Sequence, residues 1–442
     1  MSVYHILAYL AIAYYVLLYS IHMLHLAIGY RATQRWNKMG YLEEAHRLSR
    51  SSIVPPLTLV TDIASTTPDS AHWVDRTLSQ RFPEMEVLVV FREYDERVKG
   101  LIETYYLRRV DRVYVRALEA PEALEVYQSD DRRLTLVRSD GAAGGDSLNL
   151  ALNLARYPLF AVADRGPLLE DDSLLCMVRP FMEGEVRAPA VMGVELPLEP
   201  QEAGLLPPRR ITRFALMESL RIQLGFMVGT PYLGGPAAAH SSLALYRKSD
   251  LQDAKGFKTA SSCLEAEMDM TLRLHRLMRE RGLTYRFVFL PQVVARRYFP
   301  RNLGECMDEF RGRHHGISGA LRSHTGMFFK ARYGRLGMLQ LPGSWLFIKM
   351  APVMGFIAFV LSILLFAFGR VGWPVFAVFL ACSMLYPALV GAGALLVARR
   401  ELGILRGQGT VLYGYAFLTQ FWYRQLVTLA PLVGSASRRG GR

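Results

Sequence analysis

Apolar residues fall into three different patterns along the chain. Residues 4–30 are apolar apart from serine and histidine, and about 20 apolar residues suffice to cross a bilayer. From residue 56 to about residue 325, short apolar runs alternate with amphipathic stretches. Beyond residue 343, long apolar runs return at 345–368, 373–398 and 411–433. The pattern predicts a membrane anchor, then a soluble domain, then a C-terminal membrane bundle.

The middle region has the periodicity of an α/β protein. Predicted strands lie at 57–61, 86–91, 134–138, 159–163, 190–195, 242–246 and 285–290. Predicted helices lie between them, among them 146–156, 211–224 and 264–281, and Pro/Gly-rich loops lie at 196–210 and 228–238. Strands that alternate with helices in this way indicate a mostly parallel, Rossmann-like α/β sheet.

The same patterns divide the chain into six segments. They are a transmembrane helix at 1–30, a polar connector at 31–55, the α/β domain at 56–325, an amphipathic interface helix at 326–343, a membrane bundle at 344–433 and a basic tail at 434–442. In the fourth segment Lys330, Arg332 and Arg335 alternate with Phe, Leu and Met, as in a helix at a membrane interface. A surface helix of the soluble domain is the alternative.

Arg424 lies near the middle of the last apolar run. A charge in lipid costs roughly 2.5 to 3.5 kcal/mol on insertion scales. The run 411–433 therefore either packs Arg424 against protein or lies along the interface.

The net charge of +13 arises from basic residues beside the apolar segments. They include Arg31, Arg35, Lys38, Arg399 and Arg400. This distribution is typical of the positive-inside bias of membrane proteins rather than of a nucleic-acid footprint, so we expect no nucleic-acid partner. It predicts a multi-pass protein with its N-terminus outside and its soluble domain in the cytoplasm. None of the four cysteines has a CxxC spacing, which argues against a zinc ribbon or a redox pair.

An acidic turn follows one of the buried strands. The apolar run 159–163 ends directly on Asp164-Arg165-Gly166, and a helical pattern begins shortly afterwards. Open α/β sheets bind ligands at the carboxyl edge of their strands. Asp164 is therefore the first candidate for a functional carboxylate.

Four stretches resemble a known family. LSQRFPEMEVLVV (78–90), ARYPLFAVADRGPLLEDDSLL (155–175), EMDMTLRLHR (267–276) and YRFVFLPQVV (285–294) are similar to the membrane-bound family-2 glycosyltransferases, the class of the cellulose, chitin, hyaluronan and poly-N-acetylglucosamine synthases. The resemblance implies a GT-A fold, with a nucleotide sugar across the sheet edge and a divalent metal (Mg or Mn) bridging its phosphates. It places the protein in the bacterial inner membrane.

The donor-binding positions implied by this resemblance carry other residues here. Asp62 begins the run 62–66, which stands where the family has a Pro-aromatic-Asn-Glu turn, and Arg92 replaces the acid beside the uracil. An arginine can stack on a base or pair with phosphate, but it cannot accept the uracil N–H. Gly144 matches a lysine that contacts the donor. The turn at 144–146 can still bind an anion through backbone N–H groups, or Asp146 can serve as a helix cap.

The metal motif of the family, Asp-x-Asp, reads Asp164-Arg165-Gly166. One carboxylate beside a fixed cation is a poor site for a hard divalent ion. Three interpretations stay open: Asp164 holds a metal, Arg165 neutralises phosphate directly, or Asp164 is structural.

The general base of the family corresponds to Glu267, which is one methylene longer than the usual aspartate. A shift of about 1 Å in a reacting group can cost about 10²-fold in rate. Asp269 is the next acid on the same helix and matches an acidic position of the family. A solvated acidic helix face is the alternative for both residues.

The acceptor side departs from the family as well. His240-Ser241 stands in place of a Ser-Gly pair. Glu309, Arg311 and Arg313 fall in the Gln-x-x-Arg-Trp motif, and neither alignment register supplies its tryptophan. His314 and His315 lack a metal-ligand spacing, because adjacent histidine side chains diverge in most backbone conformations.

Scaffold residues of the family are retained, whereas its chemical residues are replaced. We therefore expect a catalytically degenerate glycosyltransferase-like subunit of a bacterial envelope or exopolysaccharide pathway. Its partners would be membrane lipid, a nucleotide sugar or glycan, and an active synthase or envelope-assembly protein. The alternatives are an active inverting transferase with an altered, metal-independent site, and a membrane scaffold without a ligand at the old cleft.

Overall fold

The computed structural model describes most of the chain. The described ranges are 3–40, 47–49, 51–62, 70–141, 144–164, 166–184, 186–199, 206–235, 241–259, 261–401, 409–427 and 429–430. Two predicted site residues, Arg165 and His240, lie outside these ranges, as does the basic tail at 434–442.

A single ten-stranded mixed sheet forms the centre of the soluble domain. Its strand order is β3-β4-β5-β2-β1-β6-β9-β8-β10-β7. The long strands are β1 (Leu57–Asp62), β2 (Met85–Phe91), β5 (Leu134–Arg138), β6 (Leu159–Ala163), β8 (Ala190–Pro197), β9 (Leu243–Arg247) and β10 (Val288–Arg297). Neighbouring long strands pair in parallel, except that β9 runs antiparallel between β6 and β8. Parallel pairing forms along β5-β2-β1-β6 and between β8 and β10, but five of the nine strand pairs in the described sheet are antiparallel. The sheet is therefore mixed rather than mostly parallel, and this α/β architecture fits a GT-A fold.

The seven predicted strands all form, with shifted ends in several cases. β5 and β6 have the predicted bounds, and β8 extends two residues further, to Pro197. β10 begins at Val288 rather than at residue 285, because Tyr285 makes only an isolated bridge with Arg187. The short strands β3 (Arg108–Arg109), β4 (Glu125–Gln128) and β7 (Leu168–Leu169) were not predicted, since two to four residues are too few to show a period.

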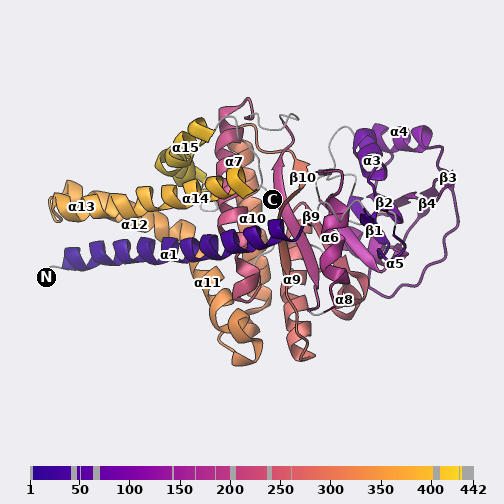
Figure 1. Ribbon diagram of the computed structural model, residues 1–442, viewed down its shortest axis with the longest axis horizontal. Coiled ribbons are helices and arrows are strands. Elements are labelled where there is room, and N and C mark those ends of the chain that lie inside the picture. Colours follow the sequence, from indigo (N-terminus) through magenta and orange to yellow (C-terminus); the bar gives the residue numbers. More distant parts are fainter. Residues whose placement is uncertain are drawn as a thin grey trace, which may run out of the picture.

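Helices cover both faces of the sheet (Figure 1). One hydrophobic cluster joins it to α5 (Gly145–Leu154), α7 (Arg210–Ile222) and α9 (Cys263–Glu280). A second cluster on the opposite face joins it to α3 (Ser70–Leu78), α4 (Glu96–Thr104) and α6 (Ser173–Met182). The short helix α8 (Lys248–Asp253) follows β9, and α10 (Leu303–Ser323) packs along α9.

Long apolar helices project from the side of the domain that carries α7 (Figure 1). They are α1 (Val3–Lys38), α12 (Ala351–Ala367), α13 (Trp373–Leu380), α14 (Tyr386–Glu401) and α15 (Gly409–Leu418). Two helices, Val3–Lys38 and Trp373–Arg400, are long and apolar enough to cross a membrane. α1 is one continuous helix, so the first part of the predicted connector, to Lys38, belongs to it.

The region of the predicted interface helix differs in detail from the prediction. A short 3-10 turn at Ala331–Tyr333 comes first, and continuous helix starts only at Leu336. This helix continues past residue 343 to Lys349 and then bends by 52° into Val353–Ala367. The predicted span 345–368 therefore contains the bend. A third crossing is present if the bent pair counts as one span.

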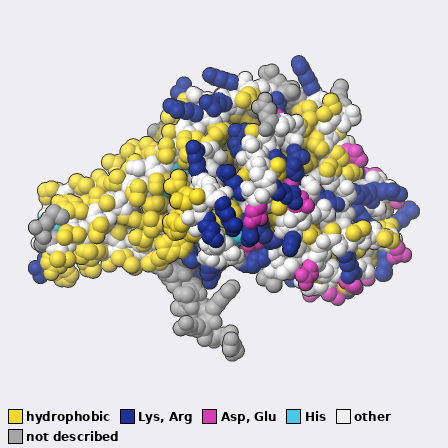
Figure 2. Space-filling model, turned by 90° about the horizontal axis from the view of Figure 1, so that it is seen from below, with side chains coloured by type: hydrophobic (Ala, Val, Ile, Leu, Met, Phe, Trp, Pro, Cys, Tyr) yellow, Lys and Arg dark blue, Asp and Glu magenta, His cyan; other side chains and the backbone are white. Residues whose placement is uncertain are grey.

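Hydrophobic side chains cover the projecting end of the molecule (Figure 2). Lys and Arg side chains gather directly beside this apolar surface, at the start of the soluble domain (Figure 2). Arg424 belongs to this boundary: its guanidinium lies 5.2 Å from the centre of the Tyr19 ring of α1 and donates to Gln420 Oε1 at 3.1 Å. Arg424 thus packs against protein, the first of the two arrangements expected from its position.

Candidate ligand cleft at the sheet edge

The topology brings Asp62 and Asp164 to the same sheet edge. β1 and β6 are parallel neighbours in the register Val60↔Val162, and each carboxylate follows two residues later. The register is held beyond the strand pairs, because Thr61 Oγ1 donates to the carbonyl oxygen of Ala163 at 2.8 Å. The side chain of Asp62 accepts a hydrogen bond from Ser147 Oγ of α5 at 3.0 Å, and the amide of Asp164 donates to Ser242 O at 2.9 Å.

The donor set at this edge does not fit a divalent metal. Gly166 occupies the place of a second carboxylate and has a φ of 55°, and no group of three His, Cys, Asp or Glu side chains within the described ranges converges on a common point. A hard cation such as Mg²⁺ or Mn²⁺ takes several oxygen ligands. The described residues at this edge therefore supply too few oxygen ligands for such an ion.

Glu267 reaches the same edge from α9. Its side chain is buried, with 4% of its surface exposed, and its Oε1 has no hydrogen-bond partner among the described residues. Burial raises the pKa of this carboxyl well above its ordinary value, and the negative charges of Asp164 and Glu195 raise it further. These surroundings favour the neutral form of the Glu267 carboxyl, whereas a general base accepts a proton in its ionised form.

Asp269 faces a different environment from Glu267. Two positions along a helix correspond to about 200° of rotation, so the two carboxyls lie on nearly opposite faces. Asp269 accepts hydrogen bonds from Arg273 Nε at 2.6 Å and from His324 Nε2 at 2.9 Å. Burial opposes its ionisation, but the hydrogen bond from His324 and the charge of Arg273 outweigh it and lower the pKa of Asp269. The structure does not bring Asp269 together with Asp164.

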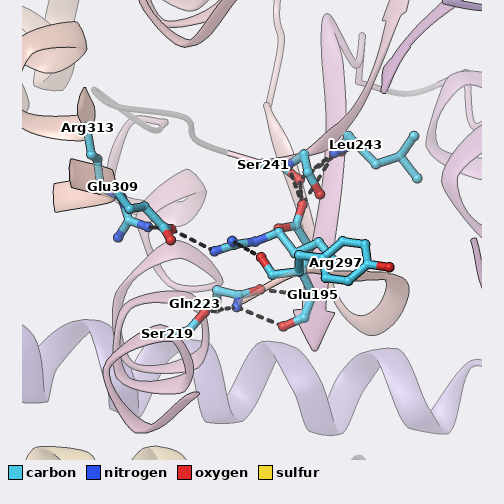
Figure 3. Close-up of polar contacts among 10 residues, drawn as sticks. Glu195, Ser219, Gln223, Ser241, Leu243, Arg297, Glu309 and Arg313 are labelled. Carbon is cyan, nitrogen blue, oxygen red and sulfur yellow. Dashed lines mark hydrogen bonds and ion pairs between the residues drawn. The ribbon is translucent and has the colours of Figure 1, made fainter. Parts of the chain in front are cut away.

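Glu195 is a buried acid that the sequence analysis missed. It lies in β8, and its Oε1 accepts from Ser241 Oγ at 2.7 Å and from the amides of Ser242 and Leu243 (Figure 3). Arg297 Nε of β10 donates to its Oε2 at 3.1 Å. The available signal was a carboxylate inside an otherwise apolar strand, since such a residue must be paired when it is buried.

The predicted acceptor residues extend this network toward α10. Arg297 Nη2 donates to Glu309 at 3.0 Å, and Arg313 Nη2 donates to the same carboxylate oxygen at 2.9 Å (Figure 3). Ser241 belongs to the network through Glu195, so Ser241, Glu309 and Arg313 are brought together as one unit. Gln223 holds the backbone of Glu195 (Figure 3): its Oε1 accepts from the Glu195 amide at 2.6 Å, and its Nε2 donates to the Glu195 carbonyl oxygen at 3.1 Å.

Arg311 and His314 have structural contacts toward the apolar helices. Arg311 pairs with Asp308 at 2.7 Å and donates to the carbonyl oxygen of Ala430. His314 Nε2 donates to the carbonyl oxygen of Lys349 at 2.9 Å, next to the bend before α12. Burial lowers the pKa of His314, although that hydrogen bond opposes the shift. These contacts join α10 to the apolar segments around Lys349 and Ala430.

The glycines at the start of α5 have a packing role. Gly144 has a φ of 54°, and a Cβ there would collide with the carbonyl oxygen of Ser261. A Cβ on Gly145 would collide with the carbonyl oxygen of Lys258. The amide of Gly145 already donates to Ser261 O at 3.3 Å, so it is not available to an anion. Arg92 is exposed just after β2, at the carboxyl end where a nucleotide was expected.

A cavity of about 840 Å³ lies between the soluble domain and the apolar helices. Glu195, Arg297 and Arg313 line it, together with residues of α1, α7 and the helix Leu336–Lys349. The sequence gives no signal for this cavity, because its walls come from segments more than 300 residues apart.

No protein-family model and no curated protein matches the chain. Solved structures with similarity include a mannosyltransferase from Pyrobaculum calidifontis in complex with GDP-mannose and Mn²⁺, at 17% identity and a TM-score of 0.49, covering 92% of this chain and 99% of that one. TarS 1–349 from S. aureus has 12% identity and a TM-score of 0.36, covering 88% and 92%.

Glucosyl-3-phosphoglycerate synthase from M. tuberculosis has 14% identity and a TM-score of 0.35, covering 63% of this chain and 84% of that one. The first is described as a mannosyltransferase and the third as a glucosyl-3-phosphoglycerate synthase. At TM-scores below 0.5 and identities below 25%, these likenesses carry no substrate and no residue role over to this chain.

Proposed function

We propose that the chain is a membrane-embedded, glycosyltransferase-like subunit whose sheet edge has lost its catalytic chemistry and serves binding or assembly. The protein would belong to a bacterial envelope or exopolysaccharide pathway, with its soluble domain in the cytoplasm. The two long apolar helices support membrane insertion, and Arg35 and Lys38 in the last turn of α1 support the cytoplasmic side.

The observation that carries this proposal is the state of Glu267. It occupies the place of a general base, yet it is buried beside two other carboxylates, and both effects raise its pKa and disfavour the ionised form. A base must be ionised and within hydrogen-bond reach of the acceptor hydroxyl. Gly166 adds to this observation, because the cleft has only one carboxylate where the family resemblance implies two. Charge on a leaving diphosphate would then be left without its usual neutralising ion.

A turnover assay tests the proposal. The full chain, purified in neutral detergent, is incubated with UDP-glucose, UDP-N-acetylglucosamine or GDP-mannose, with Mn²⁺ or with EDTA, and release of UDP or GDP is measured. We expect no release above that of heat-denatured protein. Metal-dependent release of either nucleotide would overturn the proposal.

A gain-of-ligand variant supplies the matched control. Gly166→Asp restores the second carboxylate, and Asp is among the few residues that tolerate a left-handed backbone. We expect Mn²⁺-dependent nucleotide binding by calorimetry to appear or to strengthen in this variant relative to the unmodified chain. Gly184→Ala leaves the cleft unchanged, since a Cβ at Gly184 meets nothing within 4 Å, and it should bind as the unmodified chain does.

A second candidate is an active, metal-independent transferase that uses Glu267 as base and Arg165 as electrophile. The raised pKa of Glu267 favours it, because carboxyl bases that work near neutral pH are tuned upward by burial. Under this alternative Glu267→Gln abolishes transfer, and activity rises with pH as the carboxyl ionises. If transfer is present and unchanged in Glu267→Gln, the residue is not the base.

Assembly with an active synthase is the functional role that fits an inactive sheet edge. Affinity purification of the tagged chain from its native membrane, followed by mass spectrometry, should recover a second family-2 glycosyltransferase. Recovery of the tagged chain alone, in several mild detergents, would argue against the assembly role.

A further inference from the structure

The cavity between the soluble domain and the apolar helices carries a charge excess. Five arginines and two glutamates line it. Three of the arginines are neutralised by carboxylates: Arg221 by Glu218, Arg297 by Glu195 and Glu309, and Arg313 by Glu309. Glu309 is not a lining residue, but it pairs with two of these arginines. The three positive charges of Arg221, Arg297 and Arg313 are therefore balanced by the three negative charges of Glu195, Glu218 and Glu309. Two positive charges then remain, on Arg335 and Arg424.

Neither of these two arginines is paired with a carboxylate. Arg424 donates to the amide oxygen of Gln420 and lies over the Tyr19 ring. Arg335 is exposed and has no hydrogen bond or ion pair with any residue that the structure describes. Guanidinium groups suit the bidentate recognition of phosphate. The unpaired positive charges therefore provide an anion site at the cavity wall.

Arg221 also has a nitrogen in the cavity wall that lacks an acceptor among the described residues. Arg221 is 6% exposed and binds Glu218 through Nε at 2.9 Å and Nη2 at 2.5 Å. Its Nη1 has no hydrogen-bond partner within the described ranges. A buried donor without an acceptor costs about 1–3 kcal/mol, and more when it is charged. An oxygen-rich ligand in the cavity would remove this cost.

Most of the other lining residues are apolar, although His22, His25, His314 and a few Ser and Gln side chains lie among them. Leu18 and Ile21 of α1 face Met338, Leu339 and Phe347 of the helix Leu336–Lys349 across it. Arginines and apolar side chains thus line the same cavity, and Figure 2 shows Lys and Arg side chains gathered beside the apolar end of the molecule. Its chemistry is that of an amphiphile, with an anionic head at the arginines and hydrocarbon along the helices.

We propose that this cavity binds a lipid with a phosphate head group. A phosphate monoester carries a charge of about −1.5 to −2 at pH 7, which matches the surplus of two positive charges. The volume of about 840 Å³ accommodates a head group and the first part of a hydrocarbon chain. Asp62, Asp164 and Glu267 do not line the cavity, but Glu195 borders it and its negative charge also acts on Glu267.

Binding of dodecyl phosphate tests the site. The full chain in neutral detergent micelles is titrated by microscale thermophoresis with dodecyl phosphate, with dodecan-1-ol and with inorganic phosphate. We expect dodecyl phosphate to bind at least tenfold more tightly than either of the others, because only it presents both head and chain. Equal binding of dodecan-1-ol would exclude the phosphate site, and equal binding of inorganic phosphate would exclude the lipid.

Two variants locate the head group. Arg335→Gln and Arg424→Gln should each weaken dodecyl phosphate binding about tenfold, since each removes a charged donor. Lys330→Gln is the matched control: it removes the same charge from an exposed position five residues before Arg335 and outside the cavity lining.

Lys330→Gln should bind dodecyl phosphate as tightly as the unmodified chain does. It also shows whether the charge that dodecyl phosphate gives to the micelle affects binding. Unchanged affinity in Arg335→Gln, a surface variant that should fold normally, together with unchanged affinity in Arg424→Gln would overturn the proposal. A uniform loss in all three variants would show general charge attraction and would overturn it as well.

Discussion

Glu195 and Glu267 are two buried glutamates with opposite surroundings. Glu195 is matched on both oxygens by Ser241, two backbone amides and Arg297. Glu267 instead faces Asp164 and Glu195, and its Oε1 has no hydrogen-bond partner in the described part of the chain. Buried charges persist in proteins when they are paired, and otherwise they become neutral. Glu195 is therefore part of the scaffold, whereas Glu267 is a buried carboxyl without a partner for its Oε1 in the described part of the chain, and the proposed loss of catalysis rests on this difference.

The contrast extends to the regions around these residues. The network of Glu195, Arg297, Glu309 and Arg313 joins the sheet to α10 and borders the cavity beside the apolar helices. The sheet edge carries the carboxylates of Asp62 and Asp164, but Gly166 stands where the family resemblance implies the second acid of the metal motif. Charges are paired where the soluble domain meets the apolar helices, whereas Glu267 at the sheet edge, where a nucleotide sugar was expected, lies beside other carboxylates.

The largest expected effect on stability comes from the ion-pair network around Glu195. Arg297→Met leaves the carboxylates of Glu195 and Glu309 with one partner fewer each, and removing one member of a buried ion pair costs about 3–5 kcal/mol. We expect a large fall in the thermal unfolding midpoint of the purified protein. Arg301→Met is the control, because its pair with Glu199 is half exposed and worth about 0–1 kcal/mol. Similar midpoints for the two variants would show that the network is not structural.

The next effect concerns the glycines at the sheet edge. Gly145→Ala drives a methyl group into the carbonyl oxygen of Lys258, and overpacking of this kind costs about 1–3 kcal/mol. We expect a lower unfolding midpoint. Gly100→Ala, in α4 with open space around it, should instead stabilise the protein by about 0.5–1 kcal/mol. A stable Gly145→Ala protein would reopen the interpretation of this turn as an anion site.

The smallest effect is the pH dependence of stability, and it has opposite signs for Glu267 and Asp269. The folded-state pKa of Glu267 is raised, so the folded state binds more protons and stability falls as pH rises above the unfolded pKa. The slope is at most about 1.4 kcal/mol per pH unit. Glu267→Gln should flatten this decline. Unfolding followed by circular dichroism between mildly acidic and neutral pH measures it.

Asp269 provides the opposing control. Its folded-state pKa is lowered, so its contribution is present above the unfolded pKa and is lost as pH falls through the folded pKa. Asp269→Asn should therefore remove stability at neutral pH and little in strong acid. If both variants change the pH profile in the same direction, the assigned surroundings of the two acids are wrong.

Much of the fold was predictable because the pattern of apolar and polar residues along the chain follows which side chains are buried. The strands β5 and β6 are buried apolar runs, and their bounds follow directly from the sequence. Asp164 was predictable for the same reason, since a carboxylate after such a run must lie at the edge. Glu195 was not, because its partners Ser241 and Arg297 are 46 and 102 residues away in the chain. The cavity was hidden for the same physical reason, because long-range packing leaves no local pattern.

The protonation state of Glu267 is the most direct test of the central claim that this residue is not an ionised base. Infrared difference spectroscopy of the full chain and of Glu267→Gln, both at neutral pH in lipid nanodiscs, separates a protonated carboxyl from a carboxylate. We expect the unmodified chain to show a protonated carbonyl band that Glu267→Gln removes. A carboxylate band lost in that variant, with no change in the protonated region, would contradict the account.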